Sequence, residues 1–248
     1  MKSYYFLTGL PRSGNTLFGS IINQNSNISL TANTILTDVI YQLHLLKDCQ
    51  IYKNFPDENS FNNIIKNVLN NYYKDWKAKF IIDRGLWGTP VNLELLKLII
   101  KKPKFIILYR PILECLASFI KIENPKNIES RCDELMEING MIGKGLWSIK
   151  NIIKEKEDYI VINYADLVNT PLKQIDKIYK FLNIDNFQHT FKNFEDFSAN
   201  NIKYNDSVLN APLHKIRTNK IEFNNYNIED YLPSNIIKKY SNLDIWKY

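Results

Sequence analysis

The stretch that decides the fold is Gly9-Leu10-Pro11-Arg12-Ser13-Gly14-Asn15-Thr16. An apolar run from Tyr4 to Thr8 precedes this stretch, and a helical pattern follows Gly14. A strand that turns through glycines into a helix directs several backbone N–H groups and the positive end of the helix dipole at one point. The sequence therefore predicts an anion-binding loop between a first strand and a first helix.

The spacing of this loop matches the phosphate-loop pattern GxxxxGK[ST] at every position but one, since Asn15 stands where the pattern has lysine. In nucleotide triphosphatases that lysine reaches the β- and γ-phosphates, so its absence argues against hydrolysis of ATP or GTP. Arg12 supplies a cation three residues earlier. The loop therefore predicts a phosphorylated ligand that is held without the usual lysine.

Outside the loop, three more short apolar runs have the length of buried parallel strands. They are Phe80 to Ile82, Phe105 to Tyr109 and Tyr159 to Ile162. Helical patterns lie between the runs and begin after Gly14, Thr34, Pro56, Pro90, Pro111 and Pro171. Alternating strands and helices predict an α/β fold, a doubly wound parallel sheet flanked by helices, with ligands at the carboxyl ends of the strands.

The sequence also predicts one long amphipathic helix after Pro125. Its apolar positions are Leu135, Ile138, Ile142, Leu146, Ile149 and Ile153. From Asn183 to about Asn227 the chain becomes polar and rich in asparagine, before a last helix near Pro233 to Tyr240. We predict a single domain over residues 1–248 with a long C-terminal loop that acts as a lid, the alternative being a segment without function.

Composition narrows the functional classes. Hydrophobic residues make up 45% of the 248 residues and aromatic residues 13%, which excludes a disordered chain. The net charge of +6 favours anionic ligands, but no basic helix or RNA-binding aromatic motif points to nucleic acid. Three widely spaced cysteines form no metal-binding or disulfide pattern, and no apolar run is long enough for a membrane helix or a signal peptide. We expect a cytoplasmic protein with reduced thiols and no membrane association.

A second candidate anion site follows the run Phe105 to Tyr109. The run ends in Arg110-Pro111, and Ser118 lies eight residues beyond Arg110 on the helix expected there. Eight residues are just over two helical turns, so Ser118 can face the start of that helix. An arginine fork and a hydroxyl together suit a phosphate.

The two sites together resemble those of sulfotransferases that use 3′-phosphoadenosine 5′-phosphosulfate (PAPS). The loop from Gly9 to Thr16 matches the 5′-phosphosulfate motif of that family, and the segment from Arg110 to Ser118 matches its 3′-phosphate motif. The resemblance is closest to the protein-tyrosine sulfotransferase-like branch, through Val161-Ile162-Asn163-Tyr164-Ala165-Asp166-Leu167 and Leu213-His214-Lys215-Ile216-Arg217. It implies a P-loop-like α/β fold, no metal, and transfer of a sulfuryl group to a hydroxyl or an amine.

The resemblance also implies roles for individual residues. The 5′-phosphosulfate would be held by Arg12, Ser13, Gly14, Asn15 and Thr16. Arg110 and Ser118 would hold the 3′-phosphate, and Tyr164 and Lys215 would complete the PAPS site. Arg12 would also stabilise the charge that develops on the leaving 5′-phosphate.

One departure from the family concerns the general base. The protein-tyrosine branch has a catalytic glutamate about twenty residues after the phosphate loop, but here Asn33 stands in that region and cannot accept a proton. Three other residues are candidates: Asp38, Asp83 after its strand, and His214 on the expected lid. We favour Asp38, which a helix starting near Thr34 would place on the same face as Thr34.

Two other functions are compatible with these motifs. A P-loop kinase or NTPase would use Asp83 as a Walker B carboxylate, although Asn15 argues against it. A nucleotide-binding protein without catalytic activity would account for the missing glutamate. If the protein is an active enzyme, its acceptor can be a small molecule, a carbohydrate or a peptide. The sequence does not fix the oligomeric state, and a homodimer is one of the options.

Overall fold

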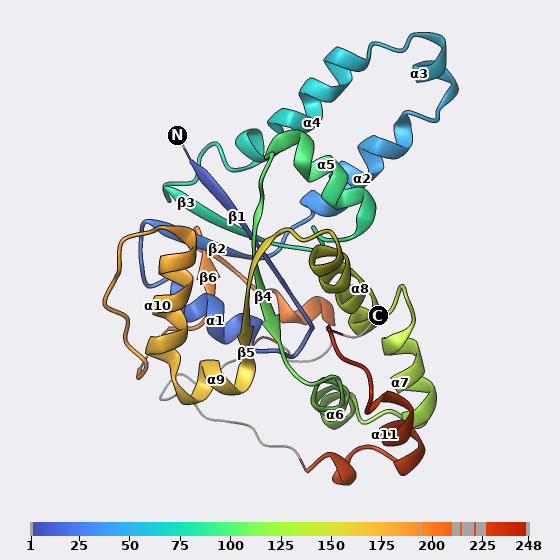
Figure 1. Cartoon of the computed structure of the whole chain (residues 1–248), viewed down its shortest axis with the longest axis vertical. Coiled ribbons are helices and arrows are strands. Elements are labelled where there is room, and N and C mark those ends of the chain that lie inside the picture. Colours follow the sequence, from blue (N-terminus) through green and yellow to red (C-terminus); the bar gives the residue numbers. More distant parts are fainter. Residues whose placement is uncertain (1, 194, 210–213, 215–220, 222–226, 247–248) are drawn as a thin grey trace.

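The computed structural model describes residues 2–193, 195–209, 214, 221 and 227–246. Its centre is a sheet of five parallel strands in the order β2-β3-β1-β4-β5 (Figure 1). The strands are β1 (Ser3–Gly9), β2 (Ile28–Asn33), β3 (Phe80–Arg84), β4 (Lys104–Tyr109) and β5 (Asp158–Asn163). This confirms the predicted doubly wound α/β architecture and its four predicted strands.

The strand β2 was not predicted from the sequence, and its composition explains why. Buried parallel strands usually appear as continuous apolar runs. In β2, the polar residues Ser29 and Thr31 alternate with apolar ones, yet both are buried. The Thr31 hydroxyl accepts a hydrogen bond of 2.9 Å from the Arg84 backbone N–H, so this polar side chain is satisfied inside the sheet.

Helices cover both faces of the sheet (Figure 1). One face, with Leu7, Ile82, Ile106 and Ile162, packs against α1 (Asn15–Ile22), α9 (Tyr164–Asn169) and α10 (Pro171–Leu182). The opposite face packs against α2 (Leu36–Leu46), α4 (Glu58–Tyr72), α5 (Pro90–Ile99), α6 (Ile112–Glu123), α7 (Ile128–Met136), α8 (Met141–Lys154) and α11 (Ser234–Tyr240). Each helix that the sequence predicted after Gly14, Thr34, Pro56, Pro90, Pro111 and Pro171 is present, as is the last helix.

The prediction of one long helix after Pro125 was wrong, because the structure contains two helices, α7 and α8. Glu137 ends α7 with an extended ψ of 155°, and Gly140 precedes α8 with a ψ of 160°. A Cβ atom at Gly140 would lie 2.2 Å from the Glu134 carbonyl oxygen, so only glycine fits this tight turn. Ile138, which the helical pattern counted as a core position, lies in the break and is 60% exposed.

An arm extends from the sheet and consists of α2, α3 (Gln50–Asn54) and α4 (Figure 1). Ile51 and Phe55, at its far end, are among the most exposed hydrophobic residues of the described chain. None of the described helices combines the length and the hydrophobicity that a membrane crossing requires.

Part of the predicted lid, 183–227, lies outside the described residues. The described part contains a short antiparallel hairpin of β6 (Ser198–Ala199) and β7 (Ile202–Lys203), followed by the 3-10 helix η1 (Asp206–Leu209). Phe197 packs so closely on Gly19 of α1 that a Cβ atom there would lie 2.5 Å from the Phe197 ring. The start of this segment is therefore packed on the same side of the sheet as α1. A second 3-10 helix, η2 (Ile228–Asp230), precedes α11.

Candidate functional site

The phosphate loop lies at the carboxyl end of β1, as predicted. Arg12 and Gly14 adopt left-handed conformations, with φ angles of 65° and 88°, and these two residues turn the chain into α1. Because the first N–H groups of a helix have no carbonyl partner within it, the start of α1 offers donors to an anion. The loop geometry therefore matches the anion site that the sequence indicates.

Asn15, at the lysine position of the usual motif, folds back into the loop. Its side-chain Nδ2 donates hydrogen bonds to the Leu10 carbonyl oxygen at 2.9 Å and to Ser13 Oγ at 3.2 Å. The Ser13 hydroxyl in turn donates to the Leu10 carbonyl oxygen at 2.6 Å. Both side chains are buried. Asn15 and Ser13 therefore rigidify the loop with their side chains. The Ser13 backbone N–H also donates to the Leu10 carbonyl oxygen, at 3.3 Å, so the N–H groups of Gly14 and Asn15 are the parts of the loop suited to a ligand.

Tyr164, the first residue of α9, forms a wall of the loop. A Cβ atom at Gly14 would lie 2.7 Å from the Tyr164 ring, so glycine is required here both for its φ angle and for space. The Arg110 guanidinium carbon lies 4.4 Å from the centre of the same ring, a cation–π contact. Tyr164 therefore links the phosphate loop to the second predicted anion site.

The second predicted site lies directly beside the first. Arg110, just after β4, donates from Nη1 to the Arg12 carbonyl oxygen at 3.1 Å. Arg12 in turn donates from Nε to the Ser118 hydroxyl at 3.2 Å. Arg110 and Ser118 are buried, and Glu114 on α6 pairs with Arg110 Nε at 2.9 Å. The structure thus brings Arg12, Arg110, Ser118 and Tyr164 together at the carboxyl edge, while Lys215 lies outside the described residues.

The sequence reasoning did not identify α8 as a support of this site. Ser148 Oγ lies 3.5 Å from the Thr8 hydroxyl and accepts a hydrogen bond of 3.1 Å from the Gly88 N–H. Gly145 approaches the backbone of Gly9. In the sequence, only the two small residues Gly145 and Ser148 on one face of this helix indicated a close approach. Small residues are common wherever a helix packs closely, so they do not by themselves indicate a functional site.

Asp83, one of the three candidate bases, is fully buried near the end of β3. Its carboxylate accepts hydrogen bonds from the Tyr73 hydroxyl, from Trp87 Nε1 at 2.7 Å and from the Thr34 hydroxyl at 3.1 and 3.2 Å. Burial raises the pKa of Asp83 to about 6, although these hydrogen bonds act in the opposite direction. Enclosed by these donors, the carboxylate acts as an anchor for the elements around it.

Asp38, the base that the sequence analysis favours, is exposed on α2. Within the described chain, no hydrogen bond or ion pair orients its carboxylate.

His214, the third candidate, belongs to a group of polar side chains at the end of β3. Its Nδ1 lies 2.5 Å from Asp206 Oδ1, and its backbone N–H donates to Asp206 Oδ2 at 3.1 Å. Its ring stacks on Tyr204, with centroids 3.6 Å apart and planes at 1°. The Tyr204 hydroxyl accepts a hydrogen bond of 3.0 Å from Arg84 Nη1. No sequence signal identified Asp206 or Tyr204, because only the fold brings them to His214.

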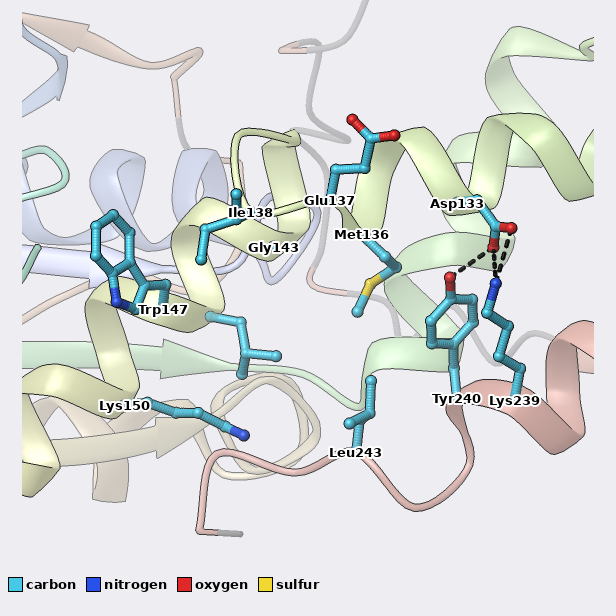
Figure 2. Close-up of a pocket in the computed structure, with 11 residues that line it drawn as sticks. Asp133, Met136, Glu137, Ile138, Gly143, Trp147, Lys150, Lys239, Tyr240 and Leu243 are labelled. Carbon is cyan, nitrogen blue, oxygen red and sulfur yellow. Dashed lines mark hydrogen bonds and ion pairs between the residues drawn. The ribbon is translucent and has the colours of Figure 1, made fainter. Parts of the chain in front are cut away.

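A separate groove of about 480 Å³ lies between α7, α8 and the C-terminal segment (Figure 2). Met136, Ile138, Trp147 and Leu243 line it, and Asp133 accepts hydrogen bonds from Lys239 and Tyr240 at one end. The groove lies on the opposite side of α8 from Gly145 and Ser148, and so it is not part of the phosphate site. In the part of the chain that the structure describes, no cluster of three or more His, Cys, Asp or Glu side chains is arranged to hold a metal ion.

Comparisons with known proteins identify a family and several similar folds. A family model described as "Sulfotransferase family" matches residues 5–189. The fold is similar to that of a sulfotransferase domain from the curacin biosynthetic pathway, with a TM-score of 0.51, 19% identity and coverage of 75% of this chain and 76% of that one. The sulfotransferase domain of the Synechococcus PCC 7002 olefin synthase has a TM-score of 0.51 and 18% identity, with 75% and 74% coverage.

A sulfotransferase from Alicyclobacillus acidocaldarius has a TM-score of 0.52 and 11% identity, and the match covers 84% of this chain and 88% of that one. No curated protein sequence matches. The family match spans the phosphate loop, Arg110, Ser118 and Tyr164, which are the residues that meet at the carboxyl edge. The chain therefore belongs to the sulfotransferase family, whose members transfer sulfuryl groups.

Proposed function

We propose that this sulfotransferase uses PAPS as its donor and transfers the sulfuryl group to the hydroxyl or amine of a small molecule, a carbohydrate or a peptide. The observation that carries the proposal is the contact between the two anion sites, made by Arg12, Arg110 and Ser118. PAPS has one phosphate on the 3′ oxygen and a phosphosulfate on the 5′ oxygen, so it needs two neighbouring sites of this kind. The cytoplasmic location predicted from the cysteines is part of this proposal.

In this proposal, the loop from Arg12 to Thr16 holds the 5′-phosphosulfate through the backbone N–H groups of Gly14, Asn15 and Thr16, while Ser13 supports the loop through its bonds to Leu10. Arg110 and Ser118 hold the 3′-phosphate, with Tyr164 against the nucleotide and Lys215 as a further cation. The buried position of Arg110 favours a strong charge-assisted hydrogen bond to phosphate. Two arginines that meet beside a single carboxylate, Glu114, also suit a ligand with several negative charges.

Transfer breaks the bond between sulfur and the 5′-phosphate oxygen as the acceptor oxygen or nitrogen bonds to sulfur. The electron pair of the broken bond leaves with adenosine 3′,5′-bisphosphate, and the acceptor loses a proton to a base. Arg12 and the loop N–H groups are suited to stabilise the charge on the leaving oxygen. The chain therefore contributes mainly positioning and electrostatic stabilisation.

Thermal unfolding with two ligands tests this function. Adenosine 3′,5′-bisphosphate without magnesium should raise the melting temperature, because it binds only the folded state. ATP with magnesium should not, since Asn15 supplies no cation for the β- and γ-phosphates. Stabilisation by ATP with magnesium alone would instead support the kinase or NTPase reading.

A further inference from the structure

His214, together with Asp206 and Tyr204, is placed to accept the proton that the acceptor must lose during transfer. In the proposed function, on which this inference rests, a neutral hydroxyl attacks sulfur and therefore needs a base at the moment of attack. Asn33, in the region where the protein-tyrosine branch has glutamate, has no acidic or basic side chain. The base must therefore come from another part of the chain.

His214 differs from the two candidate carboxylates in being both oriented and accessible. Asp83 is fully buried, and four hydrogen bonds from Tyr73, Trp87 and Thr34 use its oxygens. Asp38 is exposed, but no described group orients it. The His214 side chain is 21% exposed, and Asp206 fixes its direction.

The contacts of Asp206 determine which nitrogen of His214 carries the proton. Asp206 receives two hydrogen bonds from His214, one at each carboxylate oxygen, so its own orientation is fixed. Partial burial raises the pKa of Asp206, but the hydrogen bonds from His214 outweigh it and hold this pKa below the ordinary value. An ionised carboxylate at Nδ1 requires the proton on Nδ1, which leaves the lone pair of a neutral ring on Nε2.

Two further contacts hold the ring at the edge of the sheet where the phosphate loop lies. His214 stacks on Tyr204, and Arg84 binds the Tyr204 hydroxyl. Arg84 is the last residue of β3 and lies opposite Leu7 of β1, the strand that leads into the phosphate loop. Because β1 and β3 are parallel neighbours, their carboxyl ends share one edge, and Arg84 ties His214 to that edge.

We infer that His214 is the general base of sulfuryl transfer and that Asp206 is its positioning residue. His214 Nε2 accepts the proton of the acceptor hydroxyl while the acceptor oxygen bonds to sulfur. The electron pair of the sulfur–oxygen bond leaves with adenosine 3′,5′-bisphosphate. Asp206 remains a carboxylate and stabilises the imidazolium that forms. Tyr204 stacks on the ring and holds its plane, and Arg84 in turn holds Tyr204 through its hydroxyl.

The tautomer of His214 provides a test that does not depend on turnover. In ¹⁵N-labelled protein, long-range ¹H–¹⁵N correlation spectra distinguish His214 from His44 and His189 through the loss of one signal set in His214→Gln. At a pH where the ring is neutral, we expect the proton on Nδ1 in the wild type and a loss of that preference in Asp206→Asn. A neutral His214 ring that carries its proton on Nε2 in the wild type would contradict the roles proposed for His214 and Asp206.

Kinetics test the catalytic role with a matched control. The probe is release of adenosine 3′,5′-bisphosphate from PAPS, with water as the acceptor. We expect His214→Gln to slow release by about 100-fold or more, the usual contribution of a general base. Asp206→Asn should cause a smaller loss, and His44→Gln, the same substitution on α2, should have no effect. Binding of adenosine 3′,5′-bisphosphate by calorimetry should be unchanged in all three variants.

The outcomes separate this inference from the proposed function. A wild-type chain that neither binds adenosine 3′,5′-bisphosphate nor releases it from PAPS contradicts the proposed function. If His214→Gln keeps the wild-type turnover and Asp38→Asn loses it, the proposed function stands but the base is Asp38 and not His214.

Discussion

At the scale of single residues, Arg110 is buried and held on several sides. Its guanidinium contacts the Tyr164 ring, the Glu114 carboxylate and the Arg12 carbonyl oxygen. A side chain held from three directions loses little further entropy when it binds a ligand, so its charge is used efficiently. Its loss should therefore weaken the contact with the 3′-phosphate more than it disturbs the loop that holds the 5′ end of the nucleotide.

We predict that Arg110→Ala weakens binding of adenosine 3′,5′-bisphosphate and spares adenosine 5′-phosphate, which lacks the 3′-phosphate. The loss should be roughly 1.5 to 3 kcal/mol, the usual contribution of a hydrogen bond to a charged group. Calorimetry on both ligands measures it. Arg131→Ala, which removes a partly exposed arginine on α7, is the matched control and should leave both affinities unchanged. Equal losses for the two ligands in Arg110→Ala would contradict the assignment.

Arg12 should behave differently, because it lies in the phosphate loop where charge develops during transfer. An interaction that is strongest in the transition state lowers turnover more than it lowers nucleotide affinity. For Arg12→Ala, we expect turnover to fall by about two orders of magnitude, as when one transition-state donor is removed. Steady-state rates of PAPS turnover measure this, and an unchanged rate would disprove the role.

At the scale of elements, Asp83 connects parts of the fold that are distant in sequence. Its carboxylate binds Thr34 before α2, Tyr73 at the end of α4 and Trp87 in the connection to α5. The arm formed by α2, α3 and α4 is therefore fastened to the carboxyl edge through one buried charge. No lysine, arginine or histidine is among these partners, so the hydrogen bonds offset only part of the cost of burying that charge.

This burial predicts an unusual dependence of stability on pH. Because the pKa of Asp83 is about 6 in the folded state and the ordinary pKa of an aspartate is 3.8, the folded state binds the proton more tightly than the unfolded state. The contribution of Asp83 to stability should therefore increase as pH falls from 7 to 4, by up to about 3 kcal/mol.

Denaturant unfolding of the wild type and of Asp83→Asn at several pH values isolates this contribution from those of other carboxylates. The difference in unfolding free energy between the two proteins should shift in favour of the wild type as pH falls. A difference that stays constant between pH 7 and pH 4 would show that Asp83 titrates alike in both states.

The elements also show where sequence patterns carry information and where they do not. Helix starts at Pro90, Pro111 and Pro171 were predicted correctly, because proline is locally suited to the first turn of a helix. The break between α7 and α8 was missed because apolar residues continue at helical spacing across it. The overlooked signal was Asn139-Gly140, a turn dipeptide inside that pattern.

At the scale of the whole molecule, the sequence predicted the part of the site that is built from local motifs. Arg12 and Gly14 lie in one recognisable loop, and Arg110 and Ser118 lie in another, so topology alone brings the two loops to one edge. The surroundings of His214, the base that we propose, were harder to predict, because they depend on how the chain folds back: Asp206 lies 8 residues from His214, and Arg84 lies 120 residues from Tyr204. Nothing in the sequence pairs Asp206 with His214 or places Tyr204 against Arg84.

The order of the strands has a consequence for biosynthesis. β1 precedes the other four strands in the chain, yet it lies at the centre of the sheet between β3 and β4. Both edges of β1 therefore stay unpaired until β3 (residues 80–84) and β4 (residues 104–109) have left the ribosome. An apolar strand with open edges readily pairs with other chains. The strand that carries the phosphate loop is thus open to pairing with other chains for longer during synthesis than any later strand of this sheet.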